Sequence, residues 1–280
     1  MAGTLFLVST PIGNLDDLSR RAARVLGSVA LVAAEDTRQV AKLLRHLGLS
    51  TPTTSLHEHN ERRKTADLLA RLRAGDDVAY VSDAGTPLVS DPGADLVRAA
   101  RDAGLRVEPI PGASAVLAAL VASGLAGDEF TFLGFVPAKR GARDAWLRRA
   151  AAEPRPVVFF EAPHRLHETL DAAVRVFGNR QVAVARELTK VHEEVVTGRL
   201  VDIQARLVPP RGEYTIVVAP DDTETRAADL PPDAALWREF CDLTGAGGLG
   251  RREAVSTLAR RYGHAARDVY AAIERARPRP

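Results

Sequence analysis

The chain has 280 residues, of which 46% are hydrophobic and 26% charged, enough for one large globular domain or two to three small ones. A formal net charge of +2 does not by itself indicate a nucleic-acid partner, and the single cysteine, Cys241, excludes an internal disulfide framework. The N-terminal apolar run, residues 5–8, is too short for a signal peptide or a membrane span, so we expect a soluble cytoplasmic protein without a membrane partner.

Short apolar runs alternate with helical patterns over residues 1–122. A helix is predicted behind Asp16 and Asp17, and another begins near Ser114, which suits an N-cap. This alternation favours a parallel sheet in a layered α/β domain. Strands are predicted at 4–10, 28–36, 53–60, 77–83 and 105–112.

Residues 123–129 look like a link to a second domain that reaches residue 220. Helices are predicted there at 140–153 and 166–177, and the last two strands have little helix between them. That spacing indicates a mixed sheet. The predicted strands are 130–135, 156–163, 181–187, 193–200 and 212–220.

Residues 221–280 differ in charge and pattern from the rest of the chain. Residues 221–244 carry two basic and seven acidic side chains, whereas 245–280 carry eight basic and three acidic ones. We predict a small all-α extension with helices at 234–244, 251–262 and 264–277. Residues 254–274 have helix–turn–helix spacing, and the candidate RNA-binding residues here are Arg251, Arg252, Arg260, Arg261 and Arg267. A plain three-helix bundle with a solvated basic face and a DNA-reading module are the alternatives.

The segment "GAGGLG" (245–250) matches the glycine pattern of dinucleotide-binding loops. That interpretation requires a strand just before the glycines and a helix just after them. The preceding segment has a helical pattern instead, so we interpret the glycines as a helix–helix link.

Special loops follow the strands of the first domain. In open α/β sheets, ligands bind beyond the carboxyl ends of the strands. Several such loops combine Gly and Pro with small polar residues, and His57 and His59 lie two residues apart on a predicted strand, so both would face one side. No third ligand or cysteine supports them, so we predict no metal site. The loops are "STPIGN" (9–14), "AEDTR" (34–38), "SLHEHN" (55–60), "SDAGTP" (82–87) and "IPGASA" (110–115).

A set of longer blocks resembles one known family, over about residues 4–220 and in the expected order. The blocks are "TPIGNLDDLSRRA", "AAEDTR", "SLHEHNE", "VSDAGTPLVSDPG", "PIPGASA", "FLGFVP", "FFEAPHR", "ARELTK" and "GEYTIVV". They resemble the bacterial ribosomal RNA small-subunit methyltransferase I family, within the tetrapyrrole (corrin/porphyrin) methylase superfamily.

The resemblance implies a tetrapyrrole-methylase-like two-domain α/β fold, here with a C-terminal all-α extension. It implies an S-adenosylmethionine-dependent enzyme that methylates the ribose 2′-hydroxyl of a decoding-centre cytidine in 16S rRNA of the small ribosomal subunit. The family is generally homodimeric, and its cofactor lies in the cleft between the two domains.

The resemblance also implies a set of cofactor-binding positions. Gly85 and Pro87 would let backbone groups approach the cofactor. Many superfamily members have a Gly-Asp-Pro-type sequence where this chain has "SDAGTP". The positions are Pro11, Ile12, Asp83, Gly85, Thr86, Ser114, Ala115, Phe160, Glu161, Ala185, Arg186, Tyr214 and Thr215.

Candidate catalytic residues stand at strand ends that face the expected cleft: Asp36, Arg38, His57 and Glu187. Glu35, His59 and Lys190 are further candidates for the base, and Arg38, Arg165 and Arg186 could clamp phosphates. A local ion pair at Glu35 and Arg38, and a tie between domains at Glu187 and Lys190, are the structural alternatives.

Two other functions compete with rRNA methylation. The first is a methylase of the same superfamily that acts on a corrin or porphyrin. The second is a DNA-binding regulator whose α/β part senses a small molecule; it rests only on the helix–turn–helix spacing of the tail.

Overall fold

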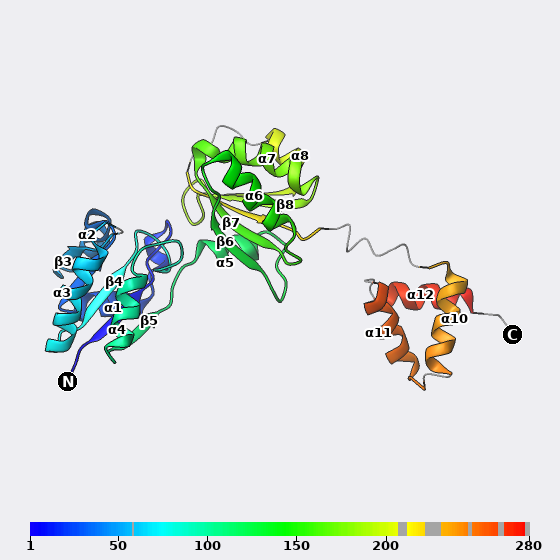
Figure 1. The fold of residues 1–280 in the computed structure, drawn as a ribbon, viewed down its shortest axis with the longest axis horizontal. Coiled ribbons are helices and arrows are strands. Elements are labelled where there is room, and N and C mark those ends of the chain that lie inside the picture. Colours follow the sequence, from blue (N-terminus) through cyan, green and yellow to red (C-terminus); the bar gives the residue numbers. More distant parts are fainter. Residues whose placement is uncertain (58, 207–211, 222–230, 246–247, 263–265, 278–280) are drawn as a thin grey trace. The chain divides into compact units, whose positions relative to one another are not determined.

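The computed structural model describes residues 1–57, 59–206, 212–221, 231–245, 248–262 and 266–277. The chain divides into two compact units, Met1–Pro220 and Asp221–Pro280. The first unit contains two five-stranded sheets, which Figure 1 shows in blue to cyan and in green to yellow.

The first sheet is parallel throughout. Its strand order is β3-β2-β4-β1-β5, and β1 pairs its Leu7 with Tyr80 of β4 on one side and its Val8 with Ile110 of β5 on the other. The predicted parallel α/β layer is therefore confirmed. The strands are β1 (Thr4–Val8), β2 (Leu31–Ala34), β3 (Thr53–Ser55), β4 (Val78–Val81) and β5 (Arg106–Ile110).

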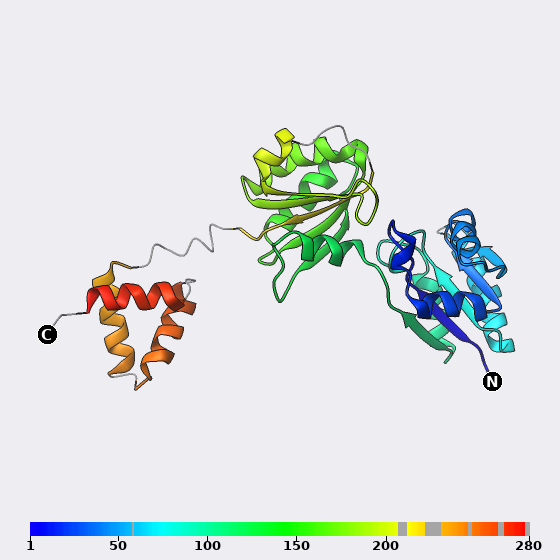
Figure 2. The ribbon, with the colours of Figure 1, turned by 180° about the vertical axis from the view of Figure 1, so that it is seen from behind.

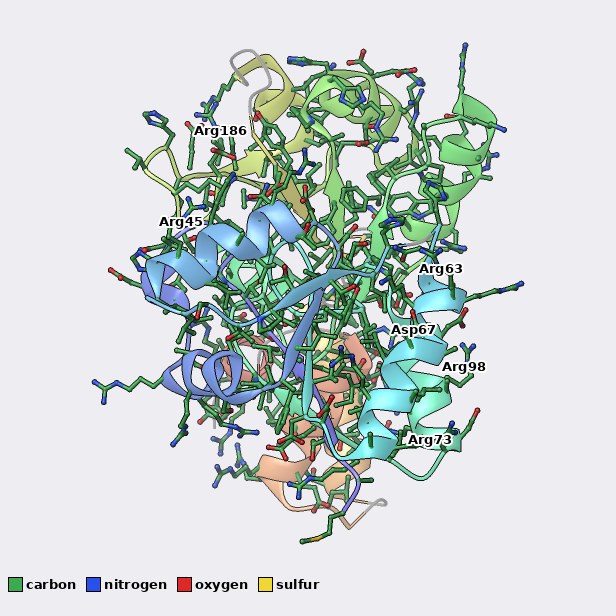
Figure 3. All side chains as sticks on the ribbon, turned by 90° about the vertical axis from the view of Figure 1, so that its left-hand side faces the viewer. Arg45, Arg63, Asp67, Arg73, Arg98 and Arg186 are labelled. Carbon is green, nitrogen blue, oxygen red and sulfur yellow. The ribbon has the colours of Figure 1, made fainter. Side chains whose placement is uncertain are left out.

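Helices cover both faces of this sheet. Leu26 and Leu43 belong to the apolar cluster on one face, and Leu68 and Leu96 to the cluster on the other. Burying each such side chain contributes about 1.5–3 kcal/mol, so the layers hold together by apolar packing. The helices are α1 (Arg20–Ser28) and α2 (Thr37–His46) on the first face, and α3 (Glu61–Ala74) and α4 (Ala94–Asp102) on the second. Figure 3 shows α3 beside α4, with Arg63, Asp67 and Arg73 on α3 and Arg98 on α4.

The first helix begins later than the sequence pattern predicts. Asp16 and Asp17 belong to a separate 3₁₀ turn, η1 (Leu15–Asp17), and α1 starts at Arg20. The Ser19 side chain accepts a hydrogen bond from the backbone N–H of Ala22, which makes Ser19 the N-cap.

The predicted strand at 53–60 is wrong beyond Ser55. The Asn60 side chain accepts a hydrogen bond from the His57 N–H at 2.9 Å and donates to the Ser55 hydroxyl at 3.2 Å. These bonds close a turn that a strand cannot contain. His57 and His59 therefore lie in the loop before α3 rather than on one face of a strand.

The second sheet is mixed, as predicted. Its order is β6-β7-β10-β8-β9; β6 runs parallel to β7, and the other neighbours are antiparallel. The strands are β6 (Thr131–Phe135), β7 (Val157–Glu161), β8 (Gln181–Arg186), β9 (Glu194–Arg199) and β10 (Tyr214–Val218).

Helices also cover both faces of the second sheet. A short helix, α8 (Leu200–Arg206), separates β9 from β10, where the sequence predicts little helix. It packs with α6 (Arg140–Ala151) and α7 (Leu166–Phe177) on one face, where Leu147, Leu170 and Ile203 are buried. In Figure 1 these three helices lie above the sheet and α5 (Ala115–Ala122) lies below it.

Helix α5 falls within residues 1–122, yet it packs on the second sheet. Val116 and Leu120 share an apolar cluster with Val158 and Val217. A division of Met1–Pro220 into domains at residue 122 remains a prediction; this packing favours a boundary before α5.

The second unit contains α10 (Asp233–Thr244), α11 (Arg251–Tyr262) and α12 (Ala266–Ala276), which Figure 2 shows as one group. Leu236, Leu258 and Ile273 are buried between them. The helix α10 precedes the glycines at 245–250, so the dinucleotide interpretation is correctly rejected. Residues 246–247 of this segment and residues 263–265 of the predicted helix–turn–helix lie outside the described residues. None of the described helices has the length and apolar character needed to cross a membrane.

We predict that Gly93→Ala destabilises the first sheet by about 2–4 kcal/mol. Gly93 has φ +106°, and a Cβ there would lie 2.5 Å from the ring of Tyr80, which is fully buried. Hydrogen exchange of the β4 amides measures the effect. Gly48→Ala is the control, because φ is +68° but no atom lies within 4 Å, so only the cost of the left-handed backbone, about 1 kcal/mol, is expected. Equal exchange in the two variants would contradict the prediction.

Candidate functional site

A cavity of about 420 Å³, here called the first cavity, lies where loops of the first sheet meet strands of the second. From the first sheet come Ile12, which follows β1, and the loop after β4. Ser114 and Ala115 start α5, and β7 and β10 supply the opposite wall. The cavity therefore combines the carboxyl edge of a parallel sheet with a second wall, an arrangement typical of ligand sites.

Most of the predicted cofactor positions line the first cavity: Ile12, Asp83, Gly85, Thr86, Ser114, Ala115, Phe160, Glu161, Tyr214 and Thr215. Pro11 lines a neighbouring cavity instead. Ala185 and Arg186 line neither cavity. Ala185 is buried against α5, and Arg186 forms an ion pair with Glu194 at 2.8 Å.

Several lining residues were missed from the sequence. Val89, Ser90 and Asp91 belong to the loop 82–93, whose glycines and prolines were the available signal. Phe135 is 53% exposed at the end of β6, and its ring centroid lies 5.2 Å from that of Phe160. Glu213 precedes β10, and the block "GEYTIVV", in which it stands next to the predicted Tyr214 and Thr215, was the available signal.

The loops after β1 and β4 are joined by backbone hydrogen bonds. The Thr10 N–H donates to Gly85 O at 2.9 Å, and the Gly85 N–H donates to Thr10 O at 3.1 Å. Gly85 has φ +76°, and a Cβ there would lie 3.2 Å from the Ile12 side chain. Glycine is therefore needed at position 85 for both conformation and space. Pro87, also predicted to aid close approach, is buried and is not part of the cavity wall.

The turn after β1 also contacts the loop after β8. The Asn14 N–H donates to the Thr189 hydroxyl at 3.0 Å. A Cβ at Gly13 would lie 2.9 Å from the Leu188 carbonyl oxygen and 2.5 Å from Lys190 Cγ. A loop of the first sheet and a loop of the second are thus in direct contact beside the cavity.

Non-glycine residues adopt a left-handed backbone conformation in the loop after β4 and in the loop after β8. Leu88 and Ser90 have φ 73° and 68°, and Glu187 and Thr189 have φ 50° and 66°. Each such residue costs about 1–2 kcal/mol, and strain of this kind concentrates at binding sites.

The charged groups that line the first cavity are acidic. Asp83, Asp91, Glu161 and Glu213 line it, and no Lys, Arg or His among the described residues does. The Glu161 carboxylate is already used: it pairs with Arg165 at 2.8 Å and accepts the Thr169 hydroxyl at 2.5 Å. The remaining carboxylates favour a cationic ligand.

Known proteins resemble this chain over most of its length. A family model for tetrapyrrole (corrin/porphyrin) methylases matches residues 4–204. The ribosomal RNA small subunit methyltransferase I of Pseudomonas aeruginosa is 51% identical over 223 residues, 78% of this chain and 79% of that one. The protein of the same name from Haemophilus influenzae is 39% identical over 275 residues, 96% of each chain. The chain belongs to the ribosomal RNA small subunit methyltransferase I family.

Solved structures support the same fold. Diphthine synthase matches with a TM-score of 0.63 at 15% identity, over 78% of this chain and 90% of that one. Cobalt precorrin-4 methyltransferase matches with a TM-score of 0.58 at 16% identity, over 77% and 94%. The predicted tetrapyrrole-methylase-like fold of this methyltransferase I family member is confirmed.

Asp36 and Arg38, two predicted catalytic residues of this family member, form an ion pair at the start of α2. The Asp36 side chain caps the helix by accepting the Arg38 N–H at 2.8 Å, and it also accepts the Arg38 guanidinium at 2.6 Å. The guanidinium hydrogen bond lowers the pKa of Asp36 to about 2. A carboxylate with so low a pKa is a weak base, so this geometry favours a positioning role for Asp36.

His57 and Glu187, the other predicted catalytic residues, also have local partners. His57 Nε2 lies 3.1 Å from the Asn60 amide nitrogen. Glu187 accepts a hydrogen bond from Lys190 Nζ at 2.9 Å, which lowers the pKa of the carboxyl. Neither residue lines the first cavity, and Glu187 lines a small neighbouring void with Lys190.

The remaining candidates are placed as follows. Glu35 is half-buried, and burial, followed by the charge of Asp83, raises the pKa of its carboxyl. Its expected pairing with Arg38 is not found, because Arg38 pairs with Asp36. His59 lines an open hollow with Arg62 and Arg63, away from the first cavity. Among the described residues, no group of three or more His, Cys, Asp or Glu is arranged to hold a metal ion.

Most of the predicted RNA-binding arginines in the second unit have acidic partners. Arg251 pairs with Glu274 at 3.1 Å, Arg261 with Glu239 at 2.8 Å, and Arg267 with Asp268 at 3.4 Å. Arg252 is exposed without a partner among the described residues, and the Arg260 side chain lies outside them. Ion pairs between helices therefore use part of the basic face.

We predict that Asp91→Asn changes how stability depends on pH. Burial, followed by the charge of Asp83, raises the pKa of Asp91 from 3.8. The folded chain therefore keeps this proton to a higher pH than the unfolded chain does. Because of this, the free energy of unfolding falls as the pH rises above 3.8 toward the raised pKa, and the lost stability is not regained at neutral pH. Asparagine removes this loss.

The measurement is hydrogen exchange of the β4 amides in both chains between about pH 3 and about pH 7, corrected for the intrinsic rate. The stability of Asp91→Asn relative to the original chain should rise with pH. A difference that stays constant would contradict the prediction.

Proposed function

We propose that this enzyme transfers a methyl group from S-adenosylmethionine to the ribose 2′-hydroxyl of a decoding-centre cytidine in 16S rRNA. The observation that carries the proposal is the acidic first cavity between the two sheets, in a chain whose relatives are named as small-subunit rRNA methyltransferases. The enzyme acts on the small ribosomal subunit, in the cytoplasm.

The residues of the first cavity fit S-adenosylmethionine, which carries a sulfonium and an ammonium cation. Asp83, Asp91 and Glu213 supply negative charge without a lining cation among the described residues. Gly85 has no side chain, and a Cβ there would lie 3.2 Å from the Ile12 side chain that lines the cavity.

We assign the cofactor to the first cavity, with Ile12, Asp83 to Thr86, Ser114, Ala115 and Tyr214 as its walls. When bound there, it supplies an electrophilic methyl carbon whose bond to sulfur breaks as a bond to the 2′-oxygen forms. The protein's task is alignment, which contributes up to about 7–11 kcal/mol, and removal of the hydroxyl proton, which adds about 10²–10⁴-fold.

The predicted catalytic residues take roles on the RNA side in this proposal. Asp36 fixes Arg38, which is exposed and can reach a phosphate with part of its guanidinium. His57 follows β3 at the same edge of the sheet. Glu187 holds Lys190 beside the cavities.

The second unit is proposed to dock RNA. Its arginines give residues 245–280 five more positive than negative charges, and phosphate contacts dominate nucleic-acid affinity. Arg252 is the best candidate, because it is exposed without a partner among the described residues.

We further propose a homodimer. Leu117 and Val121 lie four residues apart on α5 and are 52% and 71% exposed. An exposed apolar pair on one helix face supports a contact with a second copy.

The competing functions are less well supported. Named corrin and porphyrin methyltransferases resemble this chain at 22% identity or less, which supports a shared fold rather than a shared substrate. A DNA-binding regulator is less well supported because the relatives that match most of this chain are named as rRNA methyltransferases.

We predict that the enzyme labels undermethylated small subunits when given S-adenosylmethionine with a labelled methyl group. The label should map to one decoding-centre cytidine and lie on the ribose, which nuclease digestion and mass spectrometry of the nucleosides distinguish from base methylation. Fully methylated subunits are the control. Transfer to a tetrapyrrole but not to the subunit would contradict the proposal.

We predict that deletion of residues 221–280 abolishes activity on ribosomal particles but preserves cofactor binding. The deletion removes the second unit and leaves the first unit, Met1–Pro220, intact. The first unit contains every residue that lines the first cavity. Calorimetry with S-adenosylmethionine and the methyl-transfer assay measure the two effects separately. Full activity of the shortened chain would exclude the docking role.

A further inference from the structure

A second cavity of about 440 Å³ adjoins the first. It lies at the carboxyl ends of β1 and β4 and is bounded by α2. Ile12, Asp83, Ala84 and Glu213 line both cavities. Molecules bound in the two cavities would therefore share these four residues as a common wall.

The two cavities differ in charge. The second contains Lys42 and Lys190 together with the amide of Gln39, whereas no cation among the described residues lines the first. Cations and an amide suit an anion that also offers hydrogen-bonding groups, as a nucleotide does.

Gln39 and Lys42 lie three residues apart on α2 and are both exposed. Lys42 Nζ donates to Gln39 Oε1 at 3.1 Å, which leaves the Gln39 NH₂ without a partner among the described residues. Lys42 forms no ion pair there, and the nearby Asp36 carboxylate is paired with Arg38. One donor and one cation are thus available at the mouth of the cavity.

Lys190 remains a cation at the inner end. Burial is the largest single effect and acts to lower its pKa, but the hydrogen bond to Glu187 and the charges of Glu213 and Glu187 together outweigh it, so the pKa is raised. Its Nζ also lies 3.7 Å from Glu213 Oε2, a carboxylate at the boundary between the cavities. Lys190 is therefore a hydrogen-bond donor and not a base.

The wall carries one polar atom without a partner. The Thr10 side chain is buried, and its hydroxyl has no hydrogen-bond partner among the described residues, although its backbone is paired with Gly85. Leaving a buried hydroxyl unpaired is unfavourable, because the group loses its hydrogen bonds to water. A polar ligand in the second cavity can relieve that cost.

We infer that the second cavity is the binding site for the target ribonucleotide, with its phosphate near Lys42 and its ribose at the boundary formed by Asp83 and Glu213. This inference rests on the proposed function. At that boundary the ribose hydroxyl lies next to the first cavity, where the methyl donor is assigned. Asp83 and Glu213 are then the carboxylates closest to the transfer point, ahead of Asp36 and Glu187.

The test compares Gln39→Ala and Lys42→Ala with Arg73→Ala in the full chain. Arg73 is exposed at the carboxyl end of α3, which leads to the start of β4 at the opposite edge of the sheet (Figure 3). Methyl transfer to undermethylated small subunits is measured at varied subunit and salt concentrations, and S-adenosylmethionine binding is measured by calorimetry.

We expect KM for the subunit to rise about tenfold in Gln39→Ala and Lys42→Ala, because each loses a hydrogen bond to a charged or polar group of the nucleotide. Lys42→Ala should also reduce the slope of log KM against log salt by about 0.7–0.9, whereas Gln39→Ala should not. Arg73→Ala should leave KM unchanged, and all three variants should bind S-adenosylmethionine normally.

The outcomes separate this inference from the proposed function. If the unaltered enzyme does not methylate the subunit, the proposed function fails. If it does, and Gln39→Ala and Lys42→Ala keep the original KM, the second cavity is not the nucleotide site. Weakened S-adenosylmethionine binding in these two variants would assign the cavity to the donor and also overturn the inference.

Discussion

The parallel pairing of β1 with both β4 and β5 is the constraint on which the site depends. Because the three strands run in the same direction and in register, the loops that follow them leave the sheet at one edge. The Thr10–Gly85 hydrogen bonds continue that pairing beyond the strands. The residues after β5 then enter α5, which crosses to the second sheet and brings Ser114 into the wall of the first cavity.

Electrostatics divide the joined cavities into two chemical environments. The acidic first cavity suits a cation, and the second adds lysines where an anion is expected. Methyl transfer from a sulfonium to a nucleotide needs both partners at once. The carboxylates of Asp83 and Glu213 line both cavities, and in the proposed arrangement they stand beside the point of methyl transfer.

Patterns of neighbouring residues predicted the helices and strands whose bounds depend only on those residues. Helix α7 has the predicted bounds, because its apolar positions repeat regularly and Gly178 ends it. The strand at 53–60 was overestimated because the Asn60 side chain bonds back to residues 55 and 57, and no propensity reveals such a bond. The packing of α5 on the second sheet depends on residues far away in the sequence, so the residues of α5 alone do not predict it.

The candidate site shows the same division. Loops with glycine and proline led to the first cavity, since these residues are placed where backbone must turn tightly or come close to a ligand. Ala185 and Arg186 followed only from family resemblance, and their side chains lie elsewhere. Glu213 stands in a block that resembles the family, but the residue itself was not singled out, because its place in the cavity depends on the pairing of β10 with β7. The left-handed conformations of Leu88 and Ser90 could not be predicted either, because such conformations are expected at glycine and neither residue is a glycine.

The close approach of Gly13 to the loop after β8 has a consequence for how the two ligands communicate. Ile12, the residue before Gly13, lines both cavities. The loop that Gly13 approaches carries Lys190. Under the proposed assignment of donor and nucleotide, a shift of that loop reaches Ile12 through Gly13, because little space separates Gly13 from Leu188 and Lys190. By thermodynamic reciprocity, whatever change in affinity the nucleotide causes for the donor, the donor causes for the nucleotide. A methyl group added at position 13 would press on the loop after β8, which carries Lys190, and would therefore affect both proposed ligand sites.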